Sequence, residues 1–315
     1  MELTVESKVD FGFELRAIAL HPTKPLLYVA PSGAKPGEAQ AAAVRVNERG
    51  GYSGHTPFTL KHGSAYLSTD RANRFLLSAD YFSGAVDVYA LDEAGTPSKW
   101  VAGRDEGRKN AHCVLPSPDN RFVYIPYVKE TNALLQYRFD AGTGSLTPMD
   151  PWDAVPPAGT GPRHMAYHPK LPVVYFSNEQ HLGVSVYDSD REGRLKFRNV
   201  CDAVTDSEPK DGVSSSDLVM DASGRFLFAG IRGHSREFDW ITRYRIEANG
   251  DVRLLGRTPA DKIPWGFTLS PGGEYLIVTA YEGGTITAYR IGKGGELGRC
   301  GVLSCDKGIA DIVAR

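Results

Sequence analysis

Titratable and aromatic side chains recur in this chain at intervals of about fifty residues, each at the edge of a short apolar run. The positions before the first run of each interval are Arg16, His62, His112, Arg163, Ser216 and Trp265. The positions after the second run are Ser32, Tyr81, Val128, Glu179, Arg232 and Tyr281. Arginines and histidines combined with a single glutamate suit the binding of an anion and the transfer of protons.

These intervals follow an internal repeat. A period of about fifty residues without a helical pattern fits four short strands and their turns, which is one blade of a β-propeller. The centres of the second apolar runs are Tyr28, Leu77, Tyr124, Tyr175, Phe228 and Ile277. The third runs, at 85–89, 134–138, 184–187, 241–245 and 285–289, are rich in β-forming residues and lead into glycine-containing turns.

Blade geometry predicts that the recurring side chains meet. The first and second strands of a blade are antiparallel, so the start of one and the end of the other lie at the same edge. A propeller collects these edges around one opening of its channel. We therefore predict an anion-binding or acid–base site there.

The predicted fold is all-β, a seven-bladed propeller of antiparallel four-stranded blades forming a single domain over residues 1–315. Six repeat units are complete. Residues 1–11 are predicted to form a lone outer strand and residues 309–314 a lone inner strand, and pairing of the two would remove exposed strand edges. The blade shared by the termini is then incomplete, and a ring closed by six blades is the alternative.

Composition narrows the classes of function. The formal charge of −2, with acidic and basic residues interspersed, gives no footprint for nucleic acid or an anionic membrane surface. No apolar segment approaches the length of a membrane span, and the N-terminus lacks the regions of a signal peptide. The four cysteines form no CxxC pair, as expected for reduced thiols. A cytoplasmic protein acting on a small molecule is predicted, with its oligomeric state open.

Several segments resemble the seven-bladed propeller lactonases, a family that includes bacterial 6-phosphogluconolactonase and the fungal 3-carboxy-cis,cis-muconate lactonizing enzyme. The resemblance covers nearly the whole chain. Its most specific pieces are Gly161–Met165 with Ser177–Glu179, Ala111–His112 with Ser117–Phe122, Gly230–His234, and Gly266–Gly273.

The resemblance implies a catalytic group of His112, Arg163, Glu179 and Arg232. The other aligned side chains expected to contact substrate are Arg16, His62, Tyr81, Trp265 and Tyr281. This chain has Tyr127, Ile231 and Trp265 where members acting on phosphogluconolactone tend to have Asp or Glu, Asn and Arg. These departures leave open whether the substrate is phosphorylated.

The expected reaction is hydrolysis of a sugar-acid lactone of the aldono-, uronic-acid or phosphogluconolactone class. Glu179 would be the base, His112 the acid for the leaving oxygen, and the two arginines would bind the substrate carboxylate and oxyanion. A cycloisomerase acting on a carboxymuconate is the alternative, and a non-catalytic protein-binding platform is a second one.

Some of these residues could have purely structural roles in place of catalytic ones. Arg163 and Arg232 can serve as blade-to-blade ion-pair partners of Glu179, and His164 as a turn or packing residue. No cofactor is expected. No metal is expected either, because the aligned positions offer a single carboxylate and Ca²⁺ prefers six to eight oxygen ligands.

Overall fold

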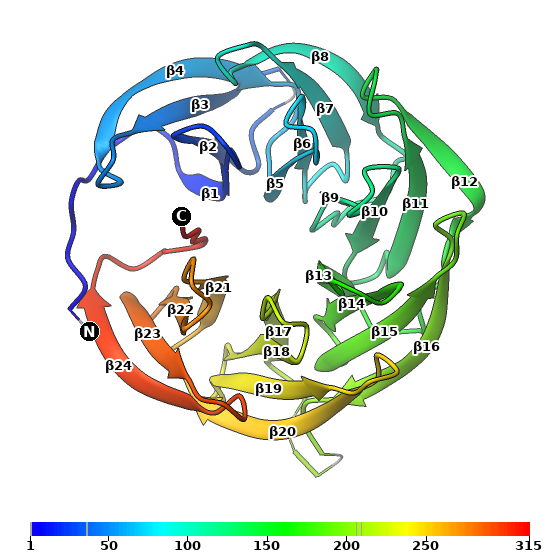
Figure 1. The fold of residues 1–315 in the computed structure, drawn as a ribbon, viewed down its shortest axis with the longest axis vertical. Helices are drawn as coiled ribbons and strands as arrows, with labels where there is room; N and C mark the ends of the chain where they lie inside the picture. The colour runs from blue at the N-terminus through cyan, green and yellow to red at the C-terminus, as the bar shows by residue number, and fades with distance from the viewer. Residues whose placement is uncertain (1, 36, 206, 209) are drawn as a thin grey trace. The chain divides into compact units, whose positions relative to one another are not determined.

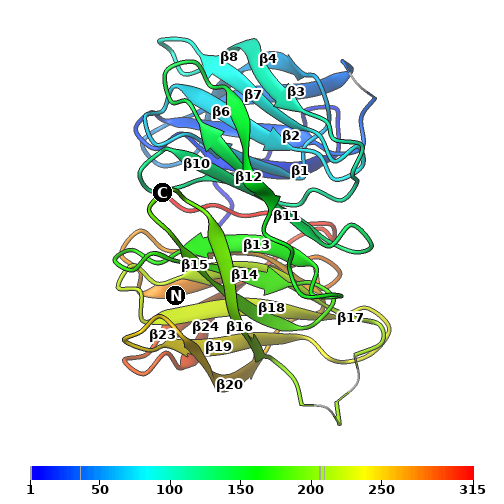
Figure 2. The ribbon, with the colours of Figure 1, turned by 90° about the vertical axis from the view of Figure 1, so that its right-hand side faces the viewer.

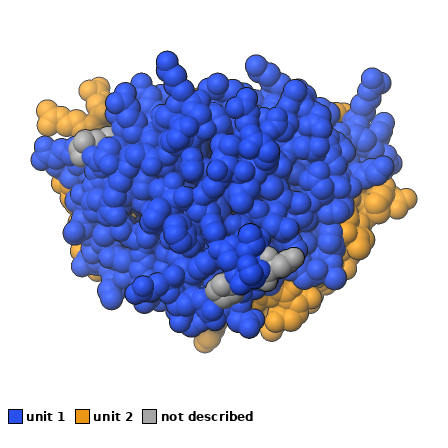
Figure 3. Space-filling view, turned by 90° about the horizontal axis from the view of Figure 1, so that it is seen from below, with its two compact units in different colours: residues 1–4, 156–315 blue, residues 5–155 orange. Residues whose placement is uncertain are grey.

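The computed structural model describes residues 2–35, 37–205, 207–208 and 210–315. Within them all regular structure is β, arranged as six four-stranded antiparallel sheets (Figure 1). The chain divides into two compact units, coloured separately in Figure 3. Unit 2 is Val5–Val155, and unit 1 is Met1–Thr4 with Pro156–Arg315.

Unit 2 contains three sheets, each with its strands paired in chain order. The first sheet is β1 (Leu15–Leu20), β2 (Leu26–Pro31), β3 (Ala39–Val46) and β4 (Tyr52–Leu60). The second is β5 (Tyr66–Thr69), β6 (Phe75–Ala79), β7 (Val86–Leu91) and β8 (Pro97–Arg104). The third is β9 (Leu115–Pro116), β10 (Phe122–Tyr127), β11 (Ala133–Phe139) and β12 (Leu146–Asp153).

Unit 1 repeats the same plan, and its strands can be followed in Figure 2. Its first sheet is β13 (Pro162–Tyr167), β14 (Val173–Asn178), β15 (Gly183–Ser189) and β16 (Leu195–Asp202). The second is β17 (Val213–Met220), β18 (Phe226–Gly233), β19 (Trp240–Ile246) and β20 (Val252–Pro259). The third is β21 (Pro264–Leu269), β22 (Tyr275–Ala280), β23 (Thr285–Ile291) and β24 (Leu297–Ser304).

The repeat predicted from the sequence is confirmed. All six predicted centres lie in second strands, and the five third runs lie in third strands apart from Ala85, which directly precedes β7. The first strands of neighbouring sheets lie side by side within each unit. The side chains at the starts of these strands are therefore collected together, as the site prediction requires.

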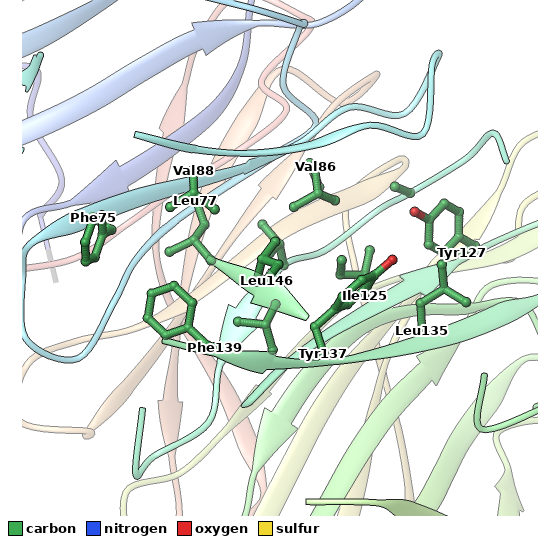
Figure 4. Packing of buried hydrophobic residues seen from close by; sticks show 14 of the residues in the cluster. Phe75, Leu77, Val86, Val88, Ile125, Tyr127, Leu135, Tyr137, Phe139 and Leu146 are labelled. Carbon is green, nitrogen blue, oxygen red and sulfur yellow. The ribbon is translucent and has the colours of Figure 1, made fainter. Parts of the chain in front are cut away.

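Apolar faces of adjacent sheets form the core. In unit 2, Phe75 and Leu77 of β6 pack with Tyr137 and Phe139 of β11 (Figure 4). In unit 1 a turn glycine, Gly250, contributes to the packing between sheets. It has a φ of 88°, and a Cβ there would lie 2.9 Å from Val173. Its carbonyl accepts a 2.8 Å hydrogen bond from the buried Tyr175 hydroxyl of the preceding sheet. Glycine at this turn is thus required by conformation and by packing.

Three first strands of unit 1 contain the same irregularity. The register of β13 on β14 passes from Pro162↔Asn178 to Met165↔Phe176, so two residues of β13 face one of β14. Equivalent shifts occur in β17 on β18 and in β21 on β22. The residue pairs in these bulges are Arg163–His164, Ser216–Asp217 and Trp265–Gly266. A β-bulge re-aims side chains, so these bulges set the directions of the candidate site residues.

The predicted terminal strands are wrong. Residues 2–14 and 305–315 belong to no strand; residue 1 lies outside the described residues. The C-terminal segment instead lies against β21, where a Cβ on Gly266 would be 3.0 Å from the Asp311 Cα (Figure 1). Alternating apolar residues do not make a strand without a neighbour to pair with. A seventh blade is not formed in the described residues.

No helix in the described ranges is long and apolar enough to cross a membrane.

Candidate active site

Arg163 and Glu179 form a buried ion pair at one edge of the β13–β14 hairpin. Arg163 is 0% exposed and sits in the β13 bulge, and Glu179 is 7% exposed and directly follows β14. The Arg163 Nε donates to Glu179 Oε2 at 3.0 Å. The Glu179 backbone N–H is held by the Gly161 carbonyl at 2.7 Å. The hairpin thus fixes the position of both partners.

Arg232, near the end of β18, reaches the same carboxylate oxygen. Its Nη2 lies 3.4 Å from Glu179 Oε2 and donates to the Ser215 carbonyl at 2.6 Å. Arg232 is 3% exposed. Two guanidinium groups and one carboxylate give these three side chains a net charge of +1.

An aromatic wall lies against the arginines. The guanidinium carbon of Arg232 is 4.5 Å from the centroid of the Trp265 ring, and that of Arg163 is 5.9 Å away. Trp265 in turn packs on Tyr281, with ring centroids 4.9 Å apart and planes tilted by 36°. Both rings are half-buried. The structure therefore brings together five predicted site residues: Arg163, Glu179, Arg232, Trp265 and Tyr281.

The cluster retains hydrogen-bonding capacity. The Arg163 Nη1 is buried and has no hydrogen-bond partner among the described residues. On the carboxylate, Oε2 is engaged by both arginines, whereas Oε1 accepts a 3.2 Å bond from the Gln180 Nε2. A buried donor without a partner costs free energy, so Arg163 Nη1 is a natural contact for a bound ligand.

His164 and Asp217 form a second buried pair beside the arginines. The His164 Nδ1 lies 2.5 Å from Asp217 Oδ1. Burial, helped by Arg163 and Arg232 and opposed by Asp217, lowers the pKa of His164. Burial opposes ionisation of Asp217, but His164, the Phe267 N–H and Arg163 together hold the pKa of that carboxyl below its ordinary value. An ionised Asp217 only accepts hydrogen bonds, so the neutral imidazole carries its proton on Nδ1.

His112 and Tyr81 are in contact within unit 2. Their rings meet edge to face with centroids 5.7 Å apart, and the Lys129 Nζ lies 5.5 Å from the Tyr81 centroid. The His112 backbone N–H donates to the Pro126 carbonyl at 3.0 Å. The catalytic role predicted for His112 remains a prediction.

Arg16 and His62 are engaged by carboxylates in unit 2. The His62 Nδ1 lies 2.8 Å from Oδ2 of the buried Asp87, and Asp87 Oδ1 accepts from the Trp100 indole at 2.8 Å. Arg16 forms a 2.6 Å ion pair with the exposed Glu14. Substrate contact by either remains a prediction.

Comparison with known proteins identifies the family of this chain. The model of the lactonase family with a seven-bladed β-propeller matches residues 2–307. The chain belongs to this family.

Relatives of the lactonase chain carry consistent names. A 6-phosphogluconolactonase from Cronobacter sakazakii is 31% identical over 312 residues, covering 97% of this chain and 89% of the relative. One from Klebsiella pneumoniae is 30% identical, covering 92% and 85%. The structure of a periplasmic gluconolactonase from Pseudomonas aeruginosa matches with a TM-score of 0.80 at 21% identity, covering 93% of this chain and 86% of that one. The predicted family and the propeller fold of four-stranded blades are confirmed. The count of seven blades is not confirmed, because the described residues form six sheets whereas the family description gives seven blades.

A cleft of about 600 Å³ lies in unit 1 of this lactonase chain. It is lined by the β18–β19 loop and the β20–β21 segment, including His234, Arg236, Trp240 and Lys262. Asp239 Oδ1 joins the two segments by accepting from Gly233 N at 3.0 Å and Ile263 N at 2.9 Å. Burial raises the pKa of Asp239. Along the chain, the two segments that line the cleft lie between Arg232 and Trp265.

Asp217 and the cleft were not predicted from the sequence, and His164 was assigned to packing. Each of His164 and Asp217 directly follows an aligned site position, which is the one signal that could have marked them. In the described part of the chain no group of three or more His, Cys, Asp or Glu residues is placed to hold a metal ion.

Proposed function

We propose that this lactonase-family chain hydrolyses a sugar-acid lactone at the cluster of Arg163, Glu179 and Arg232. The observation that supports this most strongly is the pair of buried guanidinium groups on one carboxylate oxygen against the Trp265 ring. Relatives named 6-phosphogluconolactonase and gluconolactonase favour lactones of gluconic acid.

The reaction needs a base, a donor for the oxyanion and an acid for the leaving oxygen, and the cluster can supply the first two. Water adds to the lactone carbonyl while losing a proton to a base, the carbonyl oxygen becomes an oxyanion, and the ring C–O bond then breaks. The leaving oxygen takes a proton, and the product is an open hydroxy acid that ionises. The Arg163 Nη1 donor stabilises the oxyanion in this proposal, because a fixed guanidinium in a buried site needs no reorganisation as charge develops.

Glu179 acts as the base through Oε1 in this proposal. Oε2 is held by two arginines, which orients the carboxylate, while Oε1 accepts only the bond from Gln180 among the described residues. Trp265 and Tyr281 form the wall on which the sugar ring packs. His112 is proposed as the acid for the leaving oxygen, with Tyr81, His62 and Arg16 as further substrate contacts. A single domain and a cytoplasmic location stay predictions.

Replacement of Glu179 by Gln tests this function. Wild-type protein should release acid from gluconolactones in a weakly buffered indicator assay, and Glu179→Gln should lower kcat by about 10²-fold or more, since general base catalysis contributes about 10²–10⁴-fold. Spontaneous lactone opening is subtracted with a protein-free sample. An unchanged rate in Glu179→Gln would refute the role of Glu179. No acid release from any aldono-, uronic-acid or phosphogluconolactone would refute the hydrolase, and muconates would then test the cycloisomerase alternative.

The cleft lined by the β18–β19 loop is proposed to hold the part of the lactone that does not react. Arg236 lines the cleft and forms no ion pair with any described residue, whereas Lys262 is paired with Glu282 at 2.8 Å. Arg236 is thus the cation available to a phosphate. Arg236→Ala should raise KM for 6-phosphogluconolactone about tenfold, because a hydrogen bond to a charged group contributes about 1.5–3 kcal/mol. KM for unphosphorylated gluconolactone is the internal control. Equal changes for both lactones would exclude phosphate recognition by Arg236.

A further inference from the structure

Residues 215–217 of β17 contact Glu179 and Arg232 of the arginine cluster and the strands beside them. The Ser215 N–H donates to the Glu179 carbonyl at 3.1 Å, and the Ser215 carbonyl accepts from the Arg232 Nη2 at 2.6 Å. The Ser216 carbonyl accepts from the Ser177 hydroxyl of β14 at 3.0 Å. The position of this bulge therefore sets where Glu179 and Arg232 lie.

Asp217 joins the three bulged strands to one another. Its Oδ1 accepts from the His164 Nδ1 of β13 at 2.5 Å and from its own neighbour Leu218 N at 2.7 Å. Its Oδ2 accepts from the Phe267 N–H of β21 at 2.8 Å. These strands carry Arg163 and Trp265 in their bulges, one residue before His164 and two residues before Phe267.

We infer that His164 and Asp217 are a positioning pair for the lactonase site, holding the bulges of β13, β17 and β21 so that Arg163, Arg232 and Trp265 converge on Glu179. The inference rests on the proposed function. The pair acts through its hydrogen bonds, and proton transfer to or from His164 is no part of the role.

The geometry of these bonds supports a positioning role. A β-bulge leaves a residue outside the regular ladder, so its direction depends on other contacts. In β13 the His164 backbone N–H bonds the Ser177 hydroxyl at 3.2 Å, and its ring bonds Asp217. Site geometry within about 0.5 Å is required for full activity, and such precision comes from side chains locked by hydrogen bonds behind the reacting groups.

Two substitutions of His164 separate this role from others. In His164→Asn the amide nitrogen takes about the place of Nδ1 and can still donate to Asp217, whereas His164→Leu has similar bulk and no donor. We expect kcat to fall at least tenfold in His164→Leu, with KM changed less than threefold, and to stay within about threefold of wild type in His164→Asn. The matched control is His181→Leu, which breaks an exposed His181–Asp202 pair of 2.6 Å in the same unit and should leave kcat unchanged.

Arginine Nε–H signals in ¹⁵N NMR spectra provide a readout that does not need activity. The Arg163 signal, assigned by its loss in Arg163→Lys, should be protected from exchange in wild type and His164→Asn and lost in His164→Leu. If the wild type opens no lactone, the proposed function fails while this signal still tests the positioning.

Two results would overturn the inference. If His164→Asn is as inactive as His164→Leu and one limb of the pH–rate profile disappears, His164 carries a proton in the reaction. If His164→Leu lowers Tm while kcat and the Arg163 signal are retained, the pair only stabilises the fold.

Discussion

Arg163→Ala should lower kcat/KM for lactone opening by about 10²–10³-fold, the loss expected on removing one oxyanion donor. The reason is its place in the cluster. Its Nε holds Glu179 Oε2 at 3.0 Å, and its buried Nη1 is the donor that no described residue occupies. Initial rates of acid release on the preferred lactone, measured at saturating and limiting substrate, give the separate effects on kcat and KM.

Controls separate lost chemistry from lost folding. Arg163→Lys keeps a positive charge but cannot contact Glu179 and a substrate oxygen with one planar group, so we expect little recovery. Arg253→Ala removes an exposed arginine of unit 1 that pairs with Glu247 at 3.3 Å and should leave the rate unchanged. Tm is measured for each variant. A folded Arg163→Ala protein with wild-type kcat/KM would exclude Arg163 from the reaction.

Gly84→Ala is expected to lower the free energy of unfolding by about 3 kcal/mol or more. Gly84 has a φ of 78°, a conformation that costs other residues about 1–2 kcal/mol. A Cβ at this position would lie 1.5 Å from the Arg108 carbonyl oxygen, so the 108–109 backbone must move, which adds about 1–3 kcal/mol. Urea unfolding monitored by circular dichroism measures the loss.

Gly107→Ala is the matched control for this loss. Gly107 belongs to the same unit and has a φ of 65°, but no atom lies within 4 Å of the position that a Cβ would take there. Gly107→Ala should therefore lower the free energy of unfolding only by the cost of the backbone conformation, about 1 kcal/mol. Equal losses of unfolding free energy in the two variants would show that the close approach to Arg108 adds nothing to the destabilisation. Because Arg108 precedes His112 by four residues, activity of Gly84→Ala also reports on the His112 segment.

The repeat was predictable because its signals are local. Alternation of apolar residues and a glycine in each hairpin turn depend on a few neighbouring residues, and Gly95, Gly144 and Gly250 do have positive φ values of 87°, 79° and 88°. Antiparallel pairing then follows from short connections. The repeat also predicted that five site residues converge, because equivalent positions in successive repeat units lie next to one another. These residues are Arg163, Glu179, Arg232, Trp265 and Tyr281.

The terminal segments show where local signals fail. Residues 1–11 and 309–314 alternate as strands do, yet the described part of each lacks a strand partner. A strand is stable only when a neighbouring strand satisfies its backbone groups, and whether a neighbour exists depends on the ends of other sheets.

By itself the sequence determined the blade-like sheets, their order and the residues that gather at the starts of the first strands. The tertiary structure alone decided how those residues are aimed. The bulges at Arg163–His164, Ser216–Asp217 and Trp265–Gly266 lie in strands whose sequence patterns are those of regular strands. The bond of His164 to Asp217 joins residues 53 positions apart in the chain. A bulge and a bond between sheets arise from packing among distant segments, and no short stretch of sequence contains that information.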